Sequence, residues 1–335
     1  MISVCSCKSS STPSKSIDLY GPNAITTGPD GNLWFTEAWG NKIGKISIND
    51  GKITEYNVPA VSHSTSGTID ITTGPDGNLW FTGNNKIGKL SPKDDKIIEY
   101  DILSANVGTN GITAGPDGNL WFTDNQGNKI GKISPKNGKI TDYSVPTANA
   151  GLNDIVAGPD GNLWFTEGAS NKIGKISPTT GNIIEYPIPP DFLPVGAYPT
   201  DIVNGPDGNL WFTEGEQNQI GKISSATGVI TEYHSNGNSI SITVGPDGNL
   251  WFIEPAVNII SNISPITGEI TDYSIPTTDH VPGGQTDIIT GPDGNLWFTD
   301  INKNIIGQLS PTTGIITEYS IPTRDVTEYQ ATISH

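Results

Sequence analysis

The sequence has few residues that could cross-link it or hold it in a membrane. Only two cysteines occur, Cys5 and Cys7, so a disulfide between them would close almost no loop. No run of about 18 apolar residues is present, which excludes a membrane-spanning helix. Residues 1–16 are too poor in apolar side chains for a secretory signal. We therefore predict a disordered Ser-rich leader over residues 1–15 and a cytoplasmic protein without cross-links.

Positive charge is also scarce. The chain has 18 basic and 35 acidic residues, with a formal net charge of −17. Nucleic acids and anionic membranes both need a positive surface, so we expect neither as a partner. The sequence also lacks a phosphate-binding glycine loop, a GxSxG elbow, an HExxH motif and paired CxxC motifs. We therefore expect no nucleotide or organic cofactor.

What is present is a repeat. The string GPDGNLWF occurs seven times without change, beginning at Gly28, Gly74, Gly115, Gly158, Gly205, Gly245 and Gly291. A period of about 44 residues with strand-like sequence is typical of propeller blades. We predict an all-β fold, a single seven-bladed β-propeller over residues 16–323 with four-stranded antiparallel blades around a central channel, followed by a tail over 324–335. The expected units lie near residues 21–59, 68–102, 109–146, 152–189, 199–234, 239–276 and 285–322.

The fourth unit shows how a blade should form. Four β-rich runs, DIVA, NLWFT, NKIGKIS and NIIEYPIP, are separated by turn signals, and GPDG has the Pro and Gly of a type I turn. We predict that the Trp of each unit packs between blades. Two segments compete for the outer strand of the last blade, residues 16–20 and residues 315–322. We favour residues 315–322 because the same PTTG turn precedes them as in the fourth unit.

Strand alternation should gather the polar residues at one end of the ring. The start of each first strand and the end of each second strand share that end, and the GPDG turns lie at the other. Six of the seven residues after WFT or WFI are acidic, with Gly83 the exception: Glu37, Asp124, Glu167, Glu214, Glu254 and Asp300. A second acidic set precedes first-strand isoleucines: Asp70, Asp154, Asp201 and Asp287. A solvated acidic rim is one interpretation, and an oxygen-ligated Mg²⁺ or Ca²⁺ site is the other.

Three histidines and one tryptophan accompany these carboxylates. His63, His234 and His280 lie in connections at the same end, and His234 and His280 lead into adjacent units. A neutral histidine beside a carboxylate can act as a general base, whereas an ordinary loop histidine is the alternative for each. Trp39 stands outside the repeat, in the loop of the first unit, and is a candidate for stacking on a ligand.

The repeated unit, GPDGNLWFTE followed by NKIGKIS, PTTG and ITEYSIP, resembles the streptogramin lyase (virginiamycin B lyase) family over about residues 21–322. The resemblance implies a seven-bladed propeller and a Mg²⁺-assisted elimination, in which a histidine removes a proton and a C–O bond of a cyclic depsipeptide antibiotic breaks. The family places its histidines two residues before the first-strand isoleucine of blades six and seven. Those two positions hold Ile240 and Thr286 here, and the other blades have Asn23, Ile69, Asn110, Asn153 and Thr200.

Two functional hypotheses follow. The favoured one is a monomeric binding module that takes a small molecule or a protein at the channel mouth through its acidic face, with or without a metal. Its candidate ligand-binding residues are Glu37, Trp39, Asp124, Glu167, Glu214, Asp201 and Asp287. The alternative is a Mg²⁺-dependent carbon–oxygen lyase that confers antibiotic resistance, with His280 or His234 as the base and Glu254 and Asp300 as metal ligands.

Overall fold

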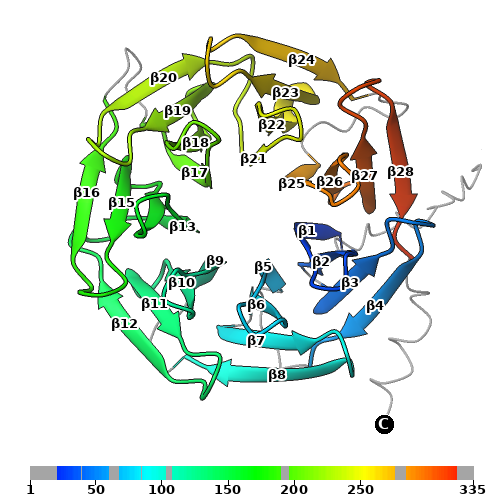
Figure 1. The fold of residues 1–335 in the computed structure, drawn as a ribbon, viewed down its shortest axis with the longest axis horizontal. Coiled ribbons are helices and arrows are strands. Elements are labelled where there is room, and N and C mark those ends of the chain that lie inside the picture. Colours follow the sequence, from blue (N-terminus) through cyan, green and yellow to red (C-terminus); the bar gives the residue numbers. More distant parts are fainter. Residues whose placement is uncertain are drawn as a thin grey trace, which may run out of the picture.

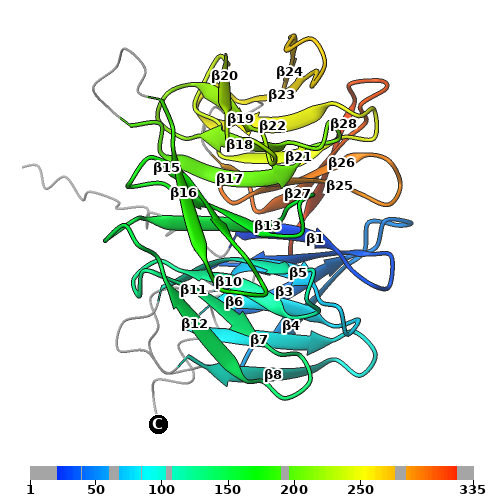
Figure 2. The ribbon, with the colours of Figure 1, turned by 60° about the vertical axis from the view of Figure 1, so that its left-hand side comes forward.

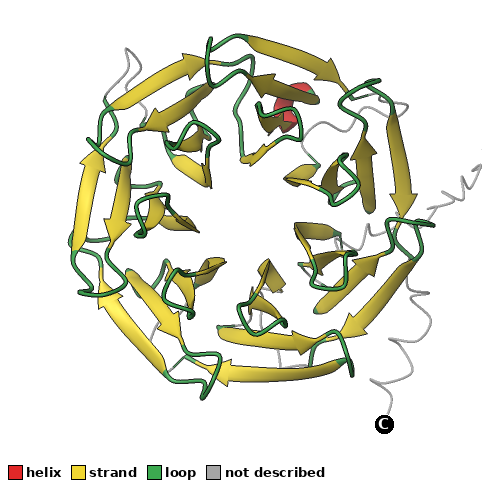
Figure 3. Cartoon of the chain, viewed as in Figure 1, coloured by secondary structure: helices red, strands yellow, loops and turns green. Residues whose placement is uncertain are grey.

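The computed structural model describes residues 21–38, 40–59, 68–83, 85–102, 108–189, 196–275 and 284–322. These residues form seven four-stranded antiparallel sheets arranged in a ring around one axis (Figure 1). Strands and loops make up nearly all of the described chain, with one short 3-10 helix, η1 (Pro255–Val257) (Figure 3). The predicted all-β, seven-bladed propeller is confirmed. The expected leader and tail, Cys5, Cys7, Trp39, His63 and His280 lie outside the described residues.

Each blade uses four consecutive strands, ordered from the axis to the perimeter (Figure 1). The innermost strands are β1 (Pro22–Thr27), β5 (Thr68–Thr73), β9 (Thr109–Ala114), β13 (Leu152–Ala157), β17 (Pro199–Asn204), β21 (Ser241–Val244) and β25 (Gln285–Thr290). The second strands are β2 (Leu33–Glu37), β6 (Leu79–Gly83), β10 (Leu120–Asp124), β14 (Leu163–Glu167), β18 (Leu210–Glu214), β22 (Leu250–Glu254) and β26 (Leu296–Asp300).

The two outer strands of every blade complete its sheet. The third strands are β3 (Lys42–Ile46), β7 (Lys86–Ser91), β11 (Lys129–Ile133), β15 (Lys172–Ile176), β19 (Gln219–Ile223), β23 (Ile259–Ile263) and β27 (Ile305–Leu309). The fourth strands are β4 (Ile53–Asn57), β8 (Lys96–Asp101), β12 (Ile140–Ser144), β16 (Ile183–Pro187), β20 (Ile230–His234), β24 (Ile270–Ser274) and β28 (Ile316–Ser320). Across the ranges given above, the structure contains no helix long and apolar enough to cross a membrane.

The GPDG turn joins the first two strands of each blade, and the fourth blade shows why its sequence repeats. The Gly161 amide donates to the Gly158 carbonyl at 3.2 Å, the i to i+3 bond of a β-turn. The Asp160 Oδ1 atom accepts both the Asn162 amide at 3.2 Å and the Trp164 indole N–H at 3.0 Å. A Cβ on Gly158 would collide with the indole ring. The turn and the buried tryptophan therefore depend on each other.

The tryptophans pack between blades, as predicted. Trp164 is fully buried, and it shares one apolar cluster with Ile188 of its own blade and with Ile202 and Phe212 of the next blade. Tyr186 of β16 stacks on its ring at 5.5 Å between centroids. Each blade therefore covers its neighbour, and the core of the protein is a ring of interfaces between blades.

Among the strands that the structure describes, the ring closes without exchange between blades. β28 pairs with β27, which confirms that the C-terminal segment supplies the outer strand of the last blade; residues 16–20 are not described. The Thr286 hydroxyl donates to the Asn23 carbonyl at 2.9 Å, and Asp287 Oδ2 accepts the Ile25 amide at 2.8 Å. Figure 2 shows the first blade, in blue, beside the orange-to-red last blade. Side-chain contacts from β25 to β1 thus take the place of a shared strand.

Candidate functional site

One end of the ring collects the connections between blades. The start of the innermost strand pairs with the end of the second strand, for example Leu152 with Glu167 and Gln285 with Asp300. We call this the loop end, because the chain enters each innermost strand and leaves each second strand there. The GPDG turns join the other ends of these strands. The two acidic sets therefore lie at the same end of the ring, as the alternation of strands predicts.

The six carboxylates that end the second strands do not form a solvated rim, so that expectation is wrong. Their exposed fractions are 0–2%: Glu37, Asp124, Glu167, Glu214, Glu254 and Asp300. For three of them, Asp124, Glu254 and Asp300, the connections at the loop end donate backbone N–H groups to the carboxylate. Asp124 Oδ1 accepts the amides of Gly108 and Gly127 at 2.9 and 3.0 Å. Buried carboxylates of this kind order the connections instead of meeting solvent.

Glu254 and Asp300, the metal ligands that the family resemblance suggests, both accept hydrogen bonds from protein donors. Glu254 Oε1 accepts two backbone amides at 2.9 and 3.0 Å, and its Oε2 accepts the Ser261 hydroxyl at 3.0 Å. Asp300 accepts the Lys303 amide at 3.0 Å and the Gln285 side-chain amide at 2.9 Å. Their oxygens are thus already used by protein donors. Of the residues that the structure describes, no group of three or more His, Cys, Asp or Glu could hold a metal ion.

Four aspartates of the innermost strands link neighbouring blades around the axis. They are half-buried, and each accepts an amide of the next blade: Asp70 from Ile112 at 2.7 Å, Asp154 from Ile202 at 3.2 Å, Asp201 from Ile242 at 2.8 Å and Asp287 from Ile25 at 2.8 Å. A side chain of one blade therefore completes the backbone hydrogen bonding of the next. We call these four residues the axial aspartates.

Three of the axial aspartates, Asp70, Asp154 and Asp287, have pKa values above that of an ordinary carboxyl group. Burial raises the pKa of Asp70 to about 8, and the charges of Asp287 and Asp201 add to this increase. Burial also raises the pKa of Asp287 to about 6, with a further contribution from Asp201. The pKa of Asp154 is raised by burial and then by the charges of Asp201 and Asp70. At neutral pH these three carboxyl groups together therefore carry fewer than three negative charges.

The two positions at which the family has histidines, and their equivalents in other blades, make structural contacts between or within blades. The side-chain amide of Asn23 donates to the Ile69 carbonyl at 2.7 Å, and the side-chain amide of Asn153 donates to the Pro199 carbonyl at 2.9 Å. Thr286 makes the equivalent bond from the last blade to the first. Ile240 packs against the apolar cluster around Trp251. Neither Ile240 nor Thr286 can remove a proton from a substrate.

His234 lies at the perimeter of the ring. It is the exposed last residue of the outermost strand β20, and its Nδ1 lies 3.4 Å from Gln219 Nε2. Two strands, β18 and β19, lie between the histidine and β17. The residues paired across the blade are Pro199 with Glu214, Glu214 with Gln219, and Gln219 with His234. The structure therefore separates His234 from the axial aspartates.

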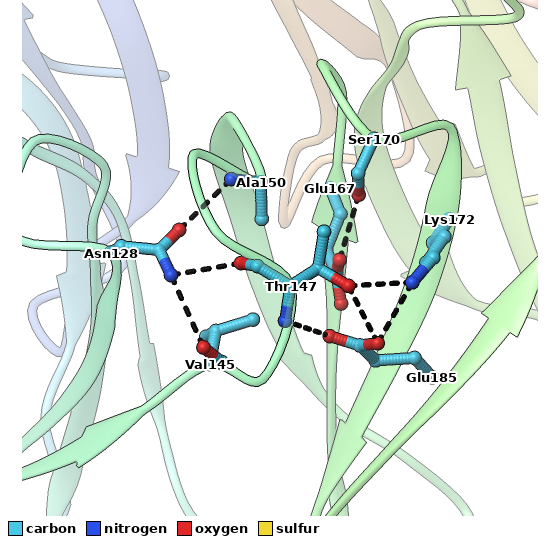
Figure 4. Close-up of polar contacts among 8 residues, drawn as sticks. All are labelled: Asn128, Val145, Thr147, Ala150, Glu167, Ser170, Lys172 and Glu185. Atoms are coloured by element: carbon cyan, nitrogen blue, oxygen red, sulfur yellow. Dashed lines mark hydrogen bonds and ion pairs between the residues drawn. The ribbon is translucent and has the colours of Figure 1, made fainter.

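A polar network fixes the connection that leads into the fourth blade (Figure 4). Lys172 Nζ donates to Glu185 Oε2 at 2.9 Å and to the Thr147 hydroxyl at 2.6 Å. Glu185 in turn accepts the Thr147 amide at 2.9 Å. Asn128 reaches from the third blade, donating to the Thr147 carbonyl and accepting the Ala150 amide, both at 2.9 Å. The connection is thereby held to both blades.

Glu167 ends the second strand next to this network. Its Oε2 accepts the Ser170 hydroxyl at 2.8 Å (Figure 4). Its Oε1 is buried and has no hydrogen-bond partner within the described part of the chain. Burial raises the pKa of Glu167 to about 7, and the charge of Glu185 adds to the increase. Near neutral pH this carboxyl group is therefore divided between its protonated and charged forms.

Sequence reasoning overlooked Tyr198, which precedes β17 at the loop end. Its carbonyl accepts the Gly215 amide at 3.1 Å. The same bond occurs in four other blades, where the acceptor is a glycine: Gly21, Gly108, Gly151 and Gly284. Tyr198 has φ of 51°, in the left-handed region, a conformation that costs a non-glycine residue about 1–2 kcal/mol. Every other non-glycine residue with positive φ in the described ranges is Asn or Asp. In the sequence, Tyr198 stands where four other blades have glycine, and this difference could have identified it as an unusual residue.

The repeat and the closed ring define the chain as a seven-bladed β-propeller. The Virginiamycin B lyase family model matches residues 9–192 and 191–335, so the chain belongs to this family. No curated protein matches the chain.

Solved structures agree with this assignment. A streptogramin B lyase structure is 36% identical, covers 90% of this chain and 95% of its own, and has a TM-score of 0.78. Virginiamycin B lyase from Staphylococcus aureus is 35% identical over 87% of this chain and 95% of its own, with a TM-score of 0.77. A catalytically inactive histidine-to-alanine variant of that enzyme with quinupristin is 36% identical over 86% and 94%, with a TM-score of 0.76.

Proposed function

We propose that this chain is a ligand-binding propeller that takes a small molecule or peptide at its loop end and does not carry out the elimination of its lyase relatives. The observation that supports this is that Ile240 and Thr286 stand at the two positions where the family has histidines. An elimination needs a base within reach of the substrate proton. Ile240 is apolar, and the Thr286 hydroxyl is bonded to the Asn23 carbonyl and to the Thr299 hydroxyl.

The loop end is the part of the ring that can be specific for a ligand. The GPDG turns at the opposite end have the same sequence in all seven blades. The connections at the loop end differ in length and sequence from blade to blade, as do the loops that carry binding residues on other rigid scaffolds. The net charge of −17 favours neutral or cationic ligands over anions. Since Glu254 and Asp300 already have protein donors, binding should not need a divalent metal.

The alternative function is a Mg²⁺-dependent carbon–oxygen lyase that linearises a cyclic depsipeptide. It is favoured by the 36% identity to a streptogramin B lyase structure. His280, in the connection that leads into the seventh blade, would then be the base, because His234 lies at the perimeter.

Incubation with quinupristin separates the two functions. We expect the purified chain to leave quinupristin intact, with and without Mg²⁺, when the products are analysed by liquid chromatography and mass spectrometry. An active streptogramin lyase serves as the positive control. Calorimetric titration in EDTA should still show saturable binding of quinupristin. A linear isomer of quinupristin, with a free carboxylate and a new C=C bond and no change in mass, that is lost in the variant His280→Ala, but not in His234→Ala, would establish the lyase instead.

A further inference from the structure

Tyr198 marks where a ligand sits at the loop end. We infer that its ring is a contact surface for a planar group of the ligand; this inference rests on the proposed function. Tyr198 directly precedes β17, so it lies at the axial side of the fifth blade. No other blade in the described ranges places an aromatic side chain at the equivalent hydrogen-bonded position.

The ring of Tyr198 spans the boundary between the fourth and fifth blades. A Cβ built on Gly168, in the loop after β14, would lie 3.2 Å from Cε1 and Cζ of the ring. A Cβ built on Gly215, in the loop after β18, would lie 3.9 Å from its Cδ1. Because neither glycine has a side chain, the backbone supports the phenol ring directly. Gly168 belongs to the loop of Glu167 and Ser170 that Figure 4 shows.

The fold does not require a tyrosine at this position. Four blades make the same backbone bond with glycine, and one of these, Gly151, has the same left-handed backbone with φ of 73°, which costs glycine no strain. A side chain that only filled a gap between blades would be buried like Trp164, yet 40% of Tyr198 is exposed. Strained residues that remain partly open to solvent are typical of ligand contacts. Tyrosine also supplies a large, rigid surface, which is why it is enriched among residues that dominate binding.

The surroundings indicate the class of ligand. The exposed Glu216 follows Gly215, and its amide donates to the Ala197 carbonyl at 3.3 Å, so it is anchored beside Tyr198. The charge of Glu216 in this loop disfavours an anionic ligand at the loop end. The geometry thus points to a planar ring carried by a neutral or cationic molecule, stacked on the open face of the phenol.

Calorimetric titration of quinupristin in EDTA tests this assignment with four proteins. They are the wild type, Tyr198→Phe, Tyr198→Asn and the control Ile266→Ala. Asparagine tolerates the left-handed backbone but lacks the ring, and Ile266 is 92% exposed in the turn between β23 and β24, away from the loop end. We expect Tyr198→Asn to weaken binding at least tenfold. Tyr198→Phe and Ile266→Ala should stay within about threefold of the wild type.

The outcomes separate the two levels of the proposal. Equal binding by Tyr198→Asn and the wild type would overturn the role of Tyr198 and leave the binding propeller standing. No binding of quinupristin by the wild type would overturn the proposed function, and the assignment of Tyr198 with it. Circular-dichroism melting checks that each variant is folded, and Tyr198→Gly replaces Tyr198→Asn if asparagine prevents folding.

Discussion

Replacing Trp164 by alanine should lower the free energy of unfolding by about 3–5 kcal/mol, as for other fully buried aromatic residues. The indole is completely buried between two blades, in the cluster that contains Ile202 and Phe212 of the next blade. Its loss would leave a cavity at that interface and remove the partner on which Tyr186 stacks. It would also remove the indole N–H that Asp160 accepts within the GPDG turn.

Urea unfolding of Trp164→Ala beside Ile184→Ala provides the measurement. Ile184 belongs to the fourth strand of the same blade and is 52% exposed, so its truncation should change the free energy of unfolding by well under about 1 kcal/mol. A loss of less than about 1 kcal/mol for Trp164→Ala would mean that the tryptophan does not hold the blades together.

The protein should become less stable as pH rises from 5 to 8. Three axial aspartates have folded-state pKa values above the ordinary value of 3.8: Asp70 at about 8, Asp287 at about 6, and Asp154, whose pKa is also raised. At a pH between the ordinary pKa of such a group and its raised pKa in the folded chain, the folded chain binds more protons than the unfolded chain. Unfolding therefore becomes more favourable as pH increases. Their contribution is fully present below pH 3.8 and is lost through pH 6 for Asp287 and pH 8 for Asp70. Glu167, with a pKa of about 7, acts in the same direction.

The aspartates of the GPDG turns do not reverse this fall in stability with rising pH. Hydrogen bonds from the Trp164 indole and from Asn162 lower the pKa of Asp160 despite partial burial. The pKa values of five other aspartates in GPDG turns are also lowered by hydrogen bonds: Asp30, Asp76, Asp117, Asp207 and Asp293. A carboxyl group with a lowered pKa contributes stability that is lost only as pH falls below its ordinary value. Above pH 5, Asp70, Asp154, Asp287 and Glu167 therefore dominate the change of stability with pH.

Melting temperatures at pH 5, 6, 7 and 8 test this prediction with the wild type and Asp70→Asn. The variant should melt lower than the wild type at pH 5, because its amide nitrogen cannot accept the second of the two backbone N–H groups that Asp70 accepts, from Ile71 and Ile112. The difference should shrink or reverse toward pH 8, where the Asp70 carboxyl group of the wild type begins to ionise. An unchanged slope in the variant, or a wild type that gains stability toward pH 8, would contradict the assigned pKa values.

The ring was predictable because its causes lie within one repeat. GPDGNLWF contains the turn, the indole and the aspartate that joins them, and these contacts are local in sequence, as between Asp160 and Trp164. The PTTG turn also indicated correctly that residues near Ile316–Ser320 form the last outer strand. Strand alternation then gave the common end of the two acidic sets.

The environment of the acidic groups was not predictable in the same way. A carboxylate at the end of a strand can face water or a covering loop, and the donors that cover Glu254 and Asp124 are backbone amides, which no residue type reveals. His234 lies at the predicted end of the ring, but the argument from strand alternation did not give its distance from the axis. In the structure, two strands lie between His234 and the innermost strand. The hydrogen bonds of the structure were needed to show that Tyr198 occupies the position that glycines hold in four other blades.

A crystal structure of the chain with quinupristin tests the central claim most directly. We predict an intact ligand at the loop end, near the start of β17 and in contact with Tyr198, with no metal ion between it and Glu254 or Asp300. A linearised ligand, a metal ion held by those two carboxylates, or a ligand seated over the GPDG turns would contradict the binding propeller described above.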